Sequence, residues 1–173
     1  MPELFVEKIP ASDSKALSAR GYALALELAA RHTGLPQGSL RFARGEFGKP
    51  YFAGIEDFHF SLSHSGEYLA LATHDSPVGV DIELLRKPDL LVARRFFTKD
   101  EQEYVAEDEK RFFEVWTRKE AYIKYTGMGL RTPLPSFSVF YLPGLRLETQ
   151  MSGEYCLSLC TKNSADTRNA PAP

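Results

Sequence analysis

The sequence predicts an α+β fold built from two halves with a similar order of elements. A strand, a helix and a pair of strands are expected within residues 4–73, and a strand, helices and a further strand pair within residues 78–160. Alternating apolar and polar residues indicate the strands, whereas apolar residues spaced three and four apart indicate the helices. No residue-level repeat relates the halves, so duplication is inferred from element order alone. We place the boundary near residues 74–77, which gives halves at 1–76 and 77–162.

In the N-terminal half we expect one long helix among short strands. A strand is predicted over residues 4–9, after which Ser12 or Asp13 can cap a helix that reaches about His32. Glycine and proline predict a loop over residues 45–52. Alternation then predicts three strands, at residues 58–65, 68–73 and 78–84.

The C-terminal half is predicted to be more helical. The TKDE segment has the spacing of a capping box, so a helix should start at Thr98. A longer helix should run from about Glu109 to Tyr125, and Gly127 should end it. The polar tail, residues 163–173, is expected to be disordered. Two further strands are predicted, at residues 137–141 and 155–160.

Composition excludes some classes of function. The chain has 21 Lys and Arg against 23 Asp and Glu, a formal charge of −2, which argues against a general nucleic-acid-binding protein. No apolar run reaches the length of a membrane span. The N-terminal segment MPELFVEKIP lacks the basic head and apolar stretch of a secretory signal. We therefore expect neither a nucleic-acid nor a membrane partner.

The two cysteines, Cys156 and Cys160, lie in a predicted strand. Strand positions four apart are separated by roughly 13 Å, whereas the Cα atoms of a disulfide lie within roughly 7 Å. The pair therefore cannot form a disulfide without breaking the strand. Two packing thiols are typical of a reducing compartment, so we expect a cytoplasmic protein.

Asp81 and Glu83 form the first candidate site. Two positions apart on a strand, they share one face with Cα atoms roughly 6.5 Å apart. Carboxylates this close repel unless a cation lies between them, and hard oxygen ligands suit magnesium. The same pair would also occur on a strand with a solvated outer face.

Glu120 adds a third carboxylate on the longer predicted helix. It shares a helical stripe with bulky apolar residues, among them Phe113, Trp116 and Ile123. Lys124, one turn on, could form an i,i+4 ion pair with it, or Glu120 could lie exposed at the edge of the stripe. A third carboxylate beside a lysine also suits a site shared by a metal and a phosphate.

Other polar segments are compatible with anion binding. His64 and the serines of SHSG, which begins at Ser63, could hold phosphate oxygens, or they could form an ordinary surface turn. Lys49, in a GKP turn, could contact a ligand or simply be a surface lysine. Arg86, Lys87, Arg94 and Arg95 could form a solvated basic face or a docking surface for an acidic partner.

The segments GKP, FSLSHSG, GVDIE, RFFTKDE and WTRKEAYIK follow one another in an order and spacing that resemble the Sfp-type 4′-phosphopantetheinyl transferases. The resemblance is dense over residues 41–130. It implies transfer of the phosphopantetheine arm of coenzyme A to a serine hydroxyl of an apo acyl or peptidyl carrier protein, with release of adenosine 3′,5′-bisphosphate. It also implies a pseudo-dimer of two α+β halves with the substrate cleft between them.

The resemblance further implies roles for individual residues. Asp81, Glu83 and Glu120 would bind Mg²⁺, and Asp81, Glu120 and Lys124 would be catalytic. Either Glu120 or a water would take the proton of the serine. The residues implied to contact coenzyme A are Lys15, Lys49, Ser63, His64, Lys119 and Lys124. Lys15 is assigned to the 3′-phosphate, which the family usually holds with basic residues near the N-terminus.

Two other classes of function remain open. A magnesium-dependent phosphodiesterase or nuclease also uses clustered carboxylates, but its common strand pattern puts a lysine where this chain has Leu85. A non-catalytic module that binds coenzyme A or another protein would use Glu120 and Lys124 as a structural pair. Because both halves lie in one chain, we expect a monomer to suffice for the cleft. The basic stretch from Arg86 to Arg95 is the expected docking surface for the carrier.

Overall fold

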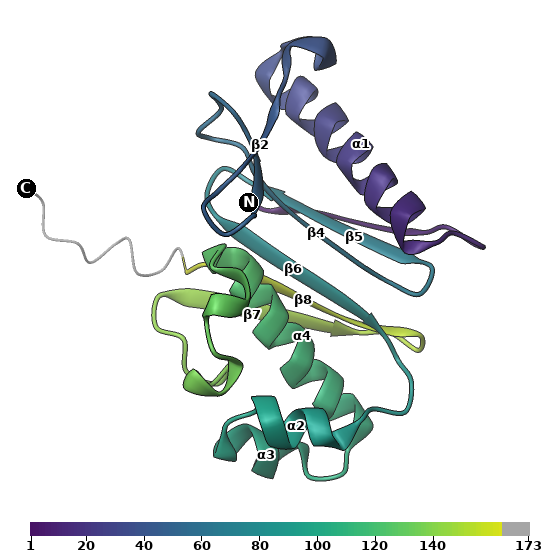
Figure 1. Cartoon of the computed structure of the whole chain (residues 1–173), viewed down its shortest axis with the longest axis vertical. Helices are drawn as coiled ribbons and strands as arrows, with labels where there is room; N and C mark the ends of the chain where they lie inside the picture. The colour runs from purple at the N-terminus through teal and green to yellow at the C-terminus, as the bar shows by residue number, and fades with distance from the viewer. Residues whose placement is uncertain (164–173) are drawn as a thin grey trace, which may run out of the picture.

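The computed structural model describes residues 1–163, apart from the side chain of Leu130, and this part of the chain has a mixed α/β fold with three small antiparallel sheets (Figure 1). The expected disordered tail lies outside the described residues, except for Asn163. The first sheet has the order β1–β5–β4, and the second sheet has the order β6–β8–β7. Their strands are β1 (Glu3–Lys8), β4 (His59–Ser65), β5 (Tyr68–His74), β6 (Val78–Leu84), β7 (Leu145–Met151) and β8 (Tyr155–Lys162).

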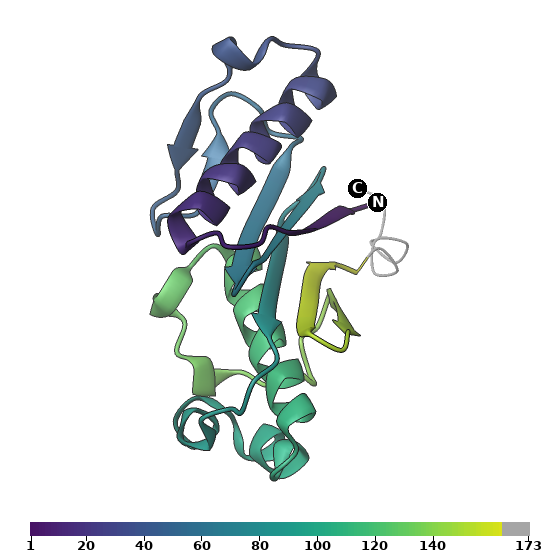
Figure 2. The same cartoon turned by 90° about the vertical axis from the view of Figure 1, so that its right-hand side faces the viewer.

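Helix α1 (Ser14–Thr33) packs against one face of the first sheet (Figure 2). Asp13 caps it by accepting a 2.7 Å hydrogen bond from the Ala16 N–H, and Gly34, with a φ of 71°, ends it. Leu24 and Leu28 of this helix share a buried core with Phe60 of β4. The predicted helix is therefore confirmed, and so are the predicted strands at β1, β4 and β5.

Helix α4 (Glu109–Thr126) packs against the second sheet, and Gly127 ends it as predicted. The closest approach is at Gly79 of β6, where a Cβ atom would overlap the Ala121 carbonyl oxygen and the Tyr125 amide nitrogen. Glycine therefore lets the strand lie directly on the helix. The predicted alternation of β6 is also confirmed, because its apolar residues face a buried core while Asp81 faces α4.

Two short helices, α2 (Leu90–Phe96) and α3 (Lys99–Val105), lie near one end of α4 (Figure 1). The predicted capping box is present: the Thr98 N–H donates to Glu101 Oε2 at 2.8 Å. Helix α2 was not predicted from the sequence. Among the described residues, three 3₁₀ turns complete the helical elements, at Gln37–Ser39, Gly129–Arg131 and Leu134–Ser136.

The segment 137–141, predicted as a strand, is irregular, and the strand of this region is β7 instead. The reason lies in what its backbone binds. The Phe137 carbonyl accepts from Lys119 at 2.7 Å, and the Val139 N–H donates to Glu101 at 2.8 Å. Side chains of two helices therefore take the backbone groups that a sheet would use.

The predicted loop at 45–52 is wrong in its last three residues. Strands β2 (Phe42–Arg44) and β3 (Pro50–Phe52) form a small hairpin in which Phe42 pairs with Phe52. Phe52 is fully buried in the core beneath α1. Burial of this ring favours a strand despite the flanking glycine and proline.

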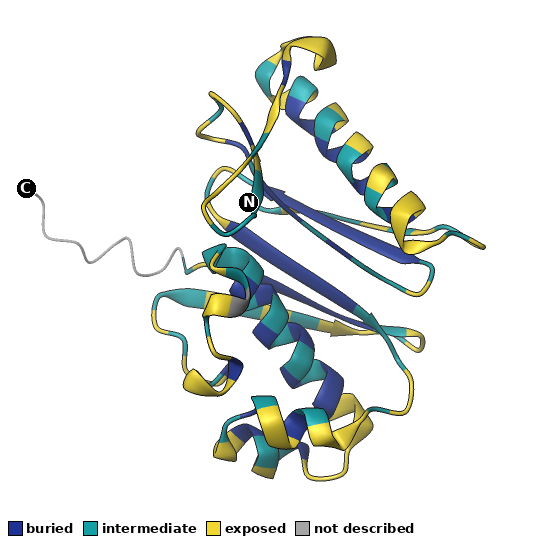
Figure 3. Cartoon of the chain, in the orientation of Figure 1, coloured by how far each residue is buried: buried dark blue, intermediate teal, exposed yellow. Residues whose placement is uncertain are grey.

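The two larger sheets meet where β4 lies beside β6 (Figure 1). Strand β6 is mostly buried, whereas β4 combines buried and half-buried residues (Figure 3). Farther out, Lys8 forms an ion pair of 2.8 Å with Glu154, which links β1 to the turn between β7 and β8. Within residues 1–163, none of the helices combines the length and apolar character that crossing a bilayer requires.

Candidate active site

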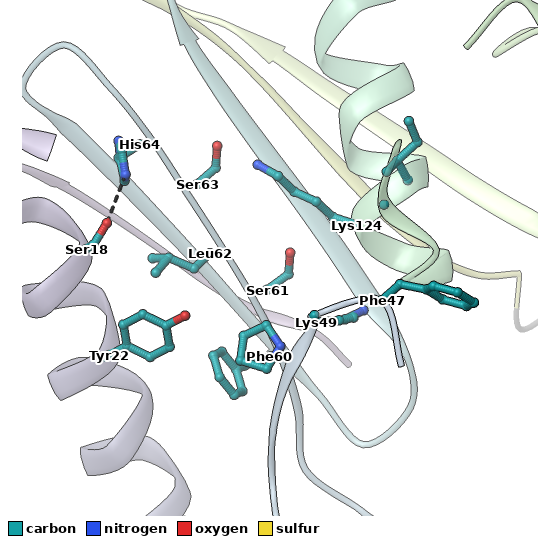
Figure 4. A pocket seen from close by; sticks show the side chains of 15 residues that line it. Ser18, Tyr22, Phe47, Lys49, Phe60, Ser61, Leu62, Ser63, His64 and Lys124 are labelled. Carbon is teal, nitrogen blue, oxygen red and sulfur yellow. Dashed lines mark hydrogen bonds between the residues drawn. The ribbon is translucent and has the colours of Figure 1, made fainter. Parts of the chain in front are cut away.

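A cavity of about 450 Å³ opens between α1, the 45–50 segment, β4 and the C-terminal end of α4 (Figure 4). Its walls carry hydroxyl, imidazole and ammonium groups as well as apolar side chains. Lys124 extends from α4 toward Ser63 on β4, so the cavity is bounded by elements far apart in the sequence. The polar side chains in its lining include Ser18, Tyr22, Lys49, Ser63, His64 and Lys124.

Asp81, in the middle of β6, is only 4% exposed. Its Oδ1 accepts hydrogen bonds from the Lys124 ammonium at 2.7 Å and the Ser63 hydroxyl at 2.8 Å. Its Oδ2 is buried and has no hydrogen-bond partner within the described chain. A buried carboxylate oxygen without a donor is costly, so this atom favours a cationic ligand.

Glu83 faces the same side of β6 as Asp81 and is held from two directions. The Ser65 hydroxyl donates to its Oε2 at 2.7 Å, and the Trp116 indole N–H donates to its Oε1 at 3.3 Å. Burial raises the pKa of Glu83, and the nearby charge of Asp81 raises it further, against the effect of these hydrogen bonds. Sequence reasoning missed both donors because neither residue is close to Glu83 along the chain.

Glu120 lies on α4 within electrostatic reach of both β6 carboxylates. Burial raises its pKa most strongly, and the charges of Asp81 and Glu83 act in the same direction, whereas Lys124 opposes them. The ion pair that Lys124 forms is with Asp81, rather than the i,i+4 pair with Glu120 considered from the sequence. Across residues 1–163, no three His, Cys, Asp or Glu side chains are arranged closely enough to hold a metal ion.

His64 faces α1 across the cavity. Its Nε2 shares hydrogen bonds with the hydroxyls of Ser18 at 3.1 Å and Ser14 at 3.4 Å (Figure 4 shows the first). Sequence reasoning did not identify these two serines, although their i,i+4 spacing near the start of a predicted helix was a usable signal. Lys15, between them in sequence, is exposed and is not among the residues that line the cavity.

Lys49 lines the cavity, but its ammonium is engaged by the protein. It donates to the Val78 carbonyl at 2.9 Å and to the Tyr125 carbonyl at 3.1 Å. Burial lowers the pKa of Lys49 to about 8. The side chain thereby ties the 45–50 segment to β6 and to the end of α4.

Lys119 is not among the residues that line the cavity, and its ammonium is engaged within the protein instead. It is fully buried, with its Nζ 2.8 Å from Glu101 Oε2, and it also donates to the Leu134 and Phe137 carbonyls. These contacts use all three ammonium donors. Successive helix residues point about 100° apart, so Glu120 can lie near Asp81 while Lys119 points to α3.

A second cavity, of about 610 Å³, adjoins the first and shares Lys49 and Gly127 with it. Its lining is richer in aromatic side chains, including Phe52, Phe58 and Tyr125. The second cavity is therefore the more apolar of the two.

Comparison with known proteins places this arrangement in a family. The model of the 4′-phosphopantetheinyl transferase superfamily matches residues 77–169, more than half of the chain. The chain is 38% identical over 124 residues to 4′-phosphopantetheinyl transferase Sfp of Bacillus subtilis (strain 168), covering 69% of this chain and 55% of the relative. It is 43% identical over 109 residues to 4′-phosphopantetheinyl transferase psf-1 of Bacillus pumilus, covering 60% and 47%.

The chain thus spans about half the length of the curated relatives it matches. The matched region contains the strand and the helix that carry Asp81, Glu83, Glu120 and Lys124. The chain belongs to the 4′-phosphopantetheinyl transferase superfamily.

Proposed function

We propose that this protein is an enzyme that transfers the 4′-phosphopantetheine group of coenzyme A to a serine hydroxyl of an apo acyl or peptidyl carrier protein, releasing adenosine 3′,5′-bisphosphate. The names of the relatives support the reaction. The observation that carries it is the Lys124–Asp81 pair, which lies beside two further carboxylates with raised pKa values. Of these four residues, Lys124 lines the cavity.

The cavity between α1, β4 and the C-terminal end of α4 is the proposed substrate cleft. Lys124, His64 and the nearby serine hydroxyls supply donors suited to phosphate oxygens. The adjoining aromatic cavity suits the adenine base, and Lys49 lies between the two compartments. In this proposal residues 1–76 and 77–162 are the two halves of a pseudo-dimer, and the cleft lies between them.

The carboxylates have the ligand chemistry of a magnesium site, although within the described residues the three side chains are not close enough together to hold the ion. Asp81 Oδ2 is buried and has no hydrogen-bond partner within the described residues. The pKa values of Glu83 and Glu120 are raised, and a cation beside them would favour their charged forms. Asp81, Glu83 and Glu120 would hold Mg²⁺, which when bound neutralises charge on the diphosphate and on the leaving group. These are hard oxygen ligands of the type that Mg²⁺ prefers.

The chain's own groups supply the remaining chemistry. Lys124 would place a positive charge against the phosphate from which adenosine 3′,5′-bisphosphate departs. Glu120 would accept the proton of the carrier serine, directly or through a water. Because a cation lowers the pKa of a carboxylate that binds it, Glu120 would accept this proton while held only loosely at the cation site.

Carrier docking is proposed at α2 and the residues before it. Arg94 and Arg95 lie on this helix, and Leu91 on the same helix is 65% exposed. Basic and apolar groups together would suit an acidic carrier with an apolar contact. We also propose a cytoplasmic monomer, in keeping with the two free, buried cysteines and with a cleft formed within one chain.

Mass spectrometry of the carrier tests the proposal directly. Apo carrier protein incubated with the enzyme, coenzyme A and Mg²⁺ should gain the mass of phosphopantetheine. A carrier with its acceptor serine changed to alanine should gain nothing, and EDTA should stop the reaction. Binding of coenzyme A without product would favour the non-catalytic module, and cleavage of plasmid DNA would favour the nuclease.

A further inference from the structure

Strands β4 and β6 belong to different sheets, and side-chain hydroxyls bridge them. Three serines at alternate positions of β4 face β6. The Ser61 hydroxyl accepts from the Val80 N–H at 3.0 Å, and the Ser65 hydroxyl accepts from the Leu84 N–H at 3.1 Å. Between them, Ser63 donates to Asp81. This serine row sets how β6 lies against β4.

Ser65 differs from Ser61 in one respect. Besides accepting from the Leu84 N–H, it donates its hydroxyl proton to Glu83 Oε2 at 2.7 Å. A serine hydroxyl has a single donor, so the bond to the β6 backbone orients it and leaves the proton for Glu83. Trp116 holds the other oxygen of the same carboxylate from α4.

We propose that Ser65 is a positioning residue for Glu83. It orients the Glu83 carboxylate beside Asp81 and so sets the affinity of the site for a divalent cation. The inference rests on the proposed function, in which Glu83 is a cation ligand.

The physical argument concerns preorganisation. A glutamate side chain has several rotatable bonds, and ordering it on cation binding costs conformational entropy. The Ser65 and Trp116 donors order it beforehand while each carboxylate oxygen keeps further lone pairs for a ligand. Groups that orient a metal ligand change metal affinity by about 10–100-fold when removed.

Ser61 provides a matched control. It lies on the same strand and the same face and makes the same kind of bond to a β6 amide, although it is buried whereas Ser65 is half-buried. Its hydroxyl contacts no carboxylate among the hydrogen bonds of the described residues. Ser61→Ala therefore removes the bridge between strands without touching Glu83.

The experiment is a Mn²⁺ titration of the full chain, without coenzyme A, followed by electron paramagnetic resonance of the free ion. Ser65→Ala should weaken Mn²⁺ binding about 10-fold, whereas Ser65→Thr, which keeps the hydroxyl, should recover most of it. Ser61→Ala should lower the melting temperature with little change in Mn²⁺ affinity. Unchanged affinity in Ser65→Ala, or equal weakening in Ser61→Ala, would overturn the inference, as would absence of Mn²⁺ binding by the unmodified protein.

If Ser65→Ala fails to fold, Trp116→Phe serves instead. Phenylalanine keeps an aromatic ring at this position but removes the indole N–H that donates to Glu83 Oε1. The affinity for Mn²⁺ should again weaken. Failure of the inference is distinguishable from failure of the proposed function. An unmodified protein that binds Mn²⁺ in the expected pattern but leaves the carrier unmodified refutes the transferase alone. If the unmodified protein transfers phosphopantetheine but Ser65→Ala and Trp116→Phe leave its Mn²⁺ affinity unchanged, only the role of Ser65 is refuted.

Discussion

The ammonium of Lys124 lies 2.7 Å from Oδ1 of Asp81, which joins the last turn of α4 to the middle of β6. The two partners differ in exposure: the side chain of Asp81 is 5% exposed and that of Lys124 is 29% exposed. The lysine therefore neutralises a buried carboxylate while remaining at the wall of the cavity. A group placed in this way can bind both the protein and an anionic ligand.

Replacing Lys124 with methionine should lower kcat/KM for coenzyme A about 100-fold, because it removes a positive charge from the proposed position of the phosphates. Lys124→Arg keeps the charge and should lose less. Steady-state transfer assays with both variants measure the difference. Methionine and arginine variants of equal activity would contradict a role for the charge.

Glu120→Gln should abolish transfer without loss of stability. Glutamine keeps the shape of the side chain but removes the negative charge and the proton acceptor. Because the charges of Asp81 and Glu83 raise the pKa of Glu120, removing its charge also relieves repulsion. The melting temperature should stay equal or rise while turnover disappears. Near-native turnover would refute the role of Glu120.

Lys119→Met should destabilise the protein by about 3–5 kcal/mol, because Glu101 would keep a buried charge without its partner. Changing both residues, Glu101→Leu with Lys119→Met, should restore part of the loss. Urea unfolding gives these free energies. Arg146→Met is the matched control: it breaks an exposed ion pair with Glu148 and should cost less than about 1 kcal/mol. Similar losses in the two single variants would contradict the structural importance of the buried pair.

The stability of the protein should depend on the titration of Lys49. Its pKa is about 8 in the folded chain against an ordinary value of 10.5, so between these values the unfolded chain binds the additional proton. The free energy of unfolding should therefore rise with pH in this window, by about 1 kcal/mol between roughly pH 7 and pH 9. Well below pH 8, Lys49 is charged in the folded protein, and the full free-energy cost of burying that charge lowers the stability.

Lys49→Met removes this contribution, so the difference in unfolding free energy between the parent and the variant should increase with pH. Groups that do not interact with Lys49 cancel in the comparison. Cys160 interacts with Lys49, but burial raises the pKa of its thiol to about 12, above this pH window. Denaturant unfolding at several pH values measures it. A difference that stays constant with pH would show that Lys49 does not titrate as inferred.

Gly79→Ala should destabilise the protein by at least about 2 kcal/mol, because the added methyl group would overlap backbone atoms of α4. The strand would have to move away from the helix and carry Asp81 away from Lys124, so transfer activity should fall as well. Gly153→Ala is a suitable control, since a Cβ at that position has open space around it. Equal melting temperatures for the two variants would contradict the close approach of β6 and α4.

Local signals determined much of the fold. The sequence predicted that Ser12 or Asp13 caps the start of α1, and Asp13 does so, because capping depends on residues next to the helix end. Alternation likewise predicted which residues of β4 and β6 share a face. The same reasoning failed at 137–141, where the backbone binds buried Lys119 and Glu101 from two helices.

The sequence by itself determined which acidic and basic residues this protein displays on one strand and one helix, since that depends on local periodicity. Only the tertiary structure decided their partners: Asp81 for Lys124, Ser65 and Trp116 for Glu83, and Glu101 for Lys119. The physical reason is that spacing along a chain orients a side chain, whereas its partner depends on which distant element packs opposite it.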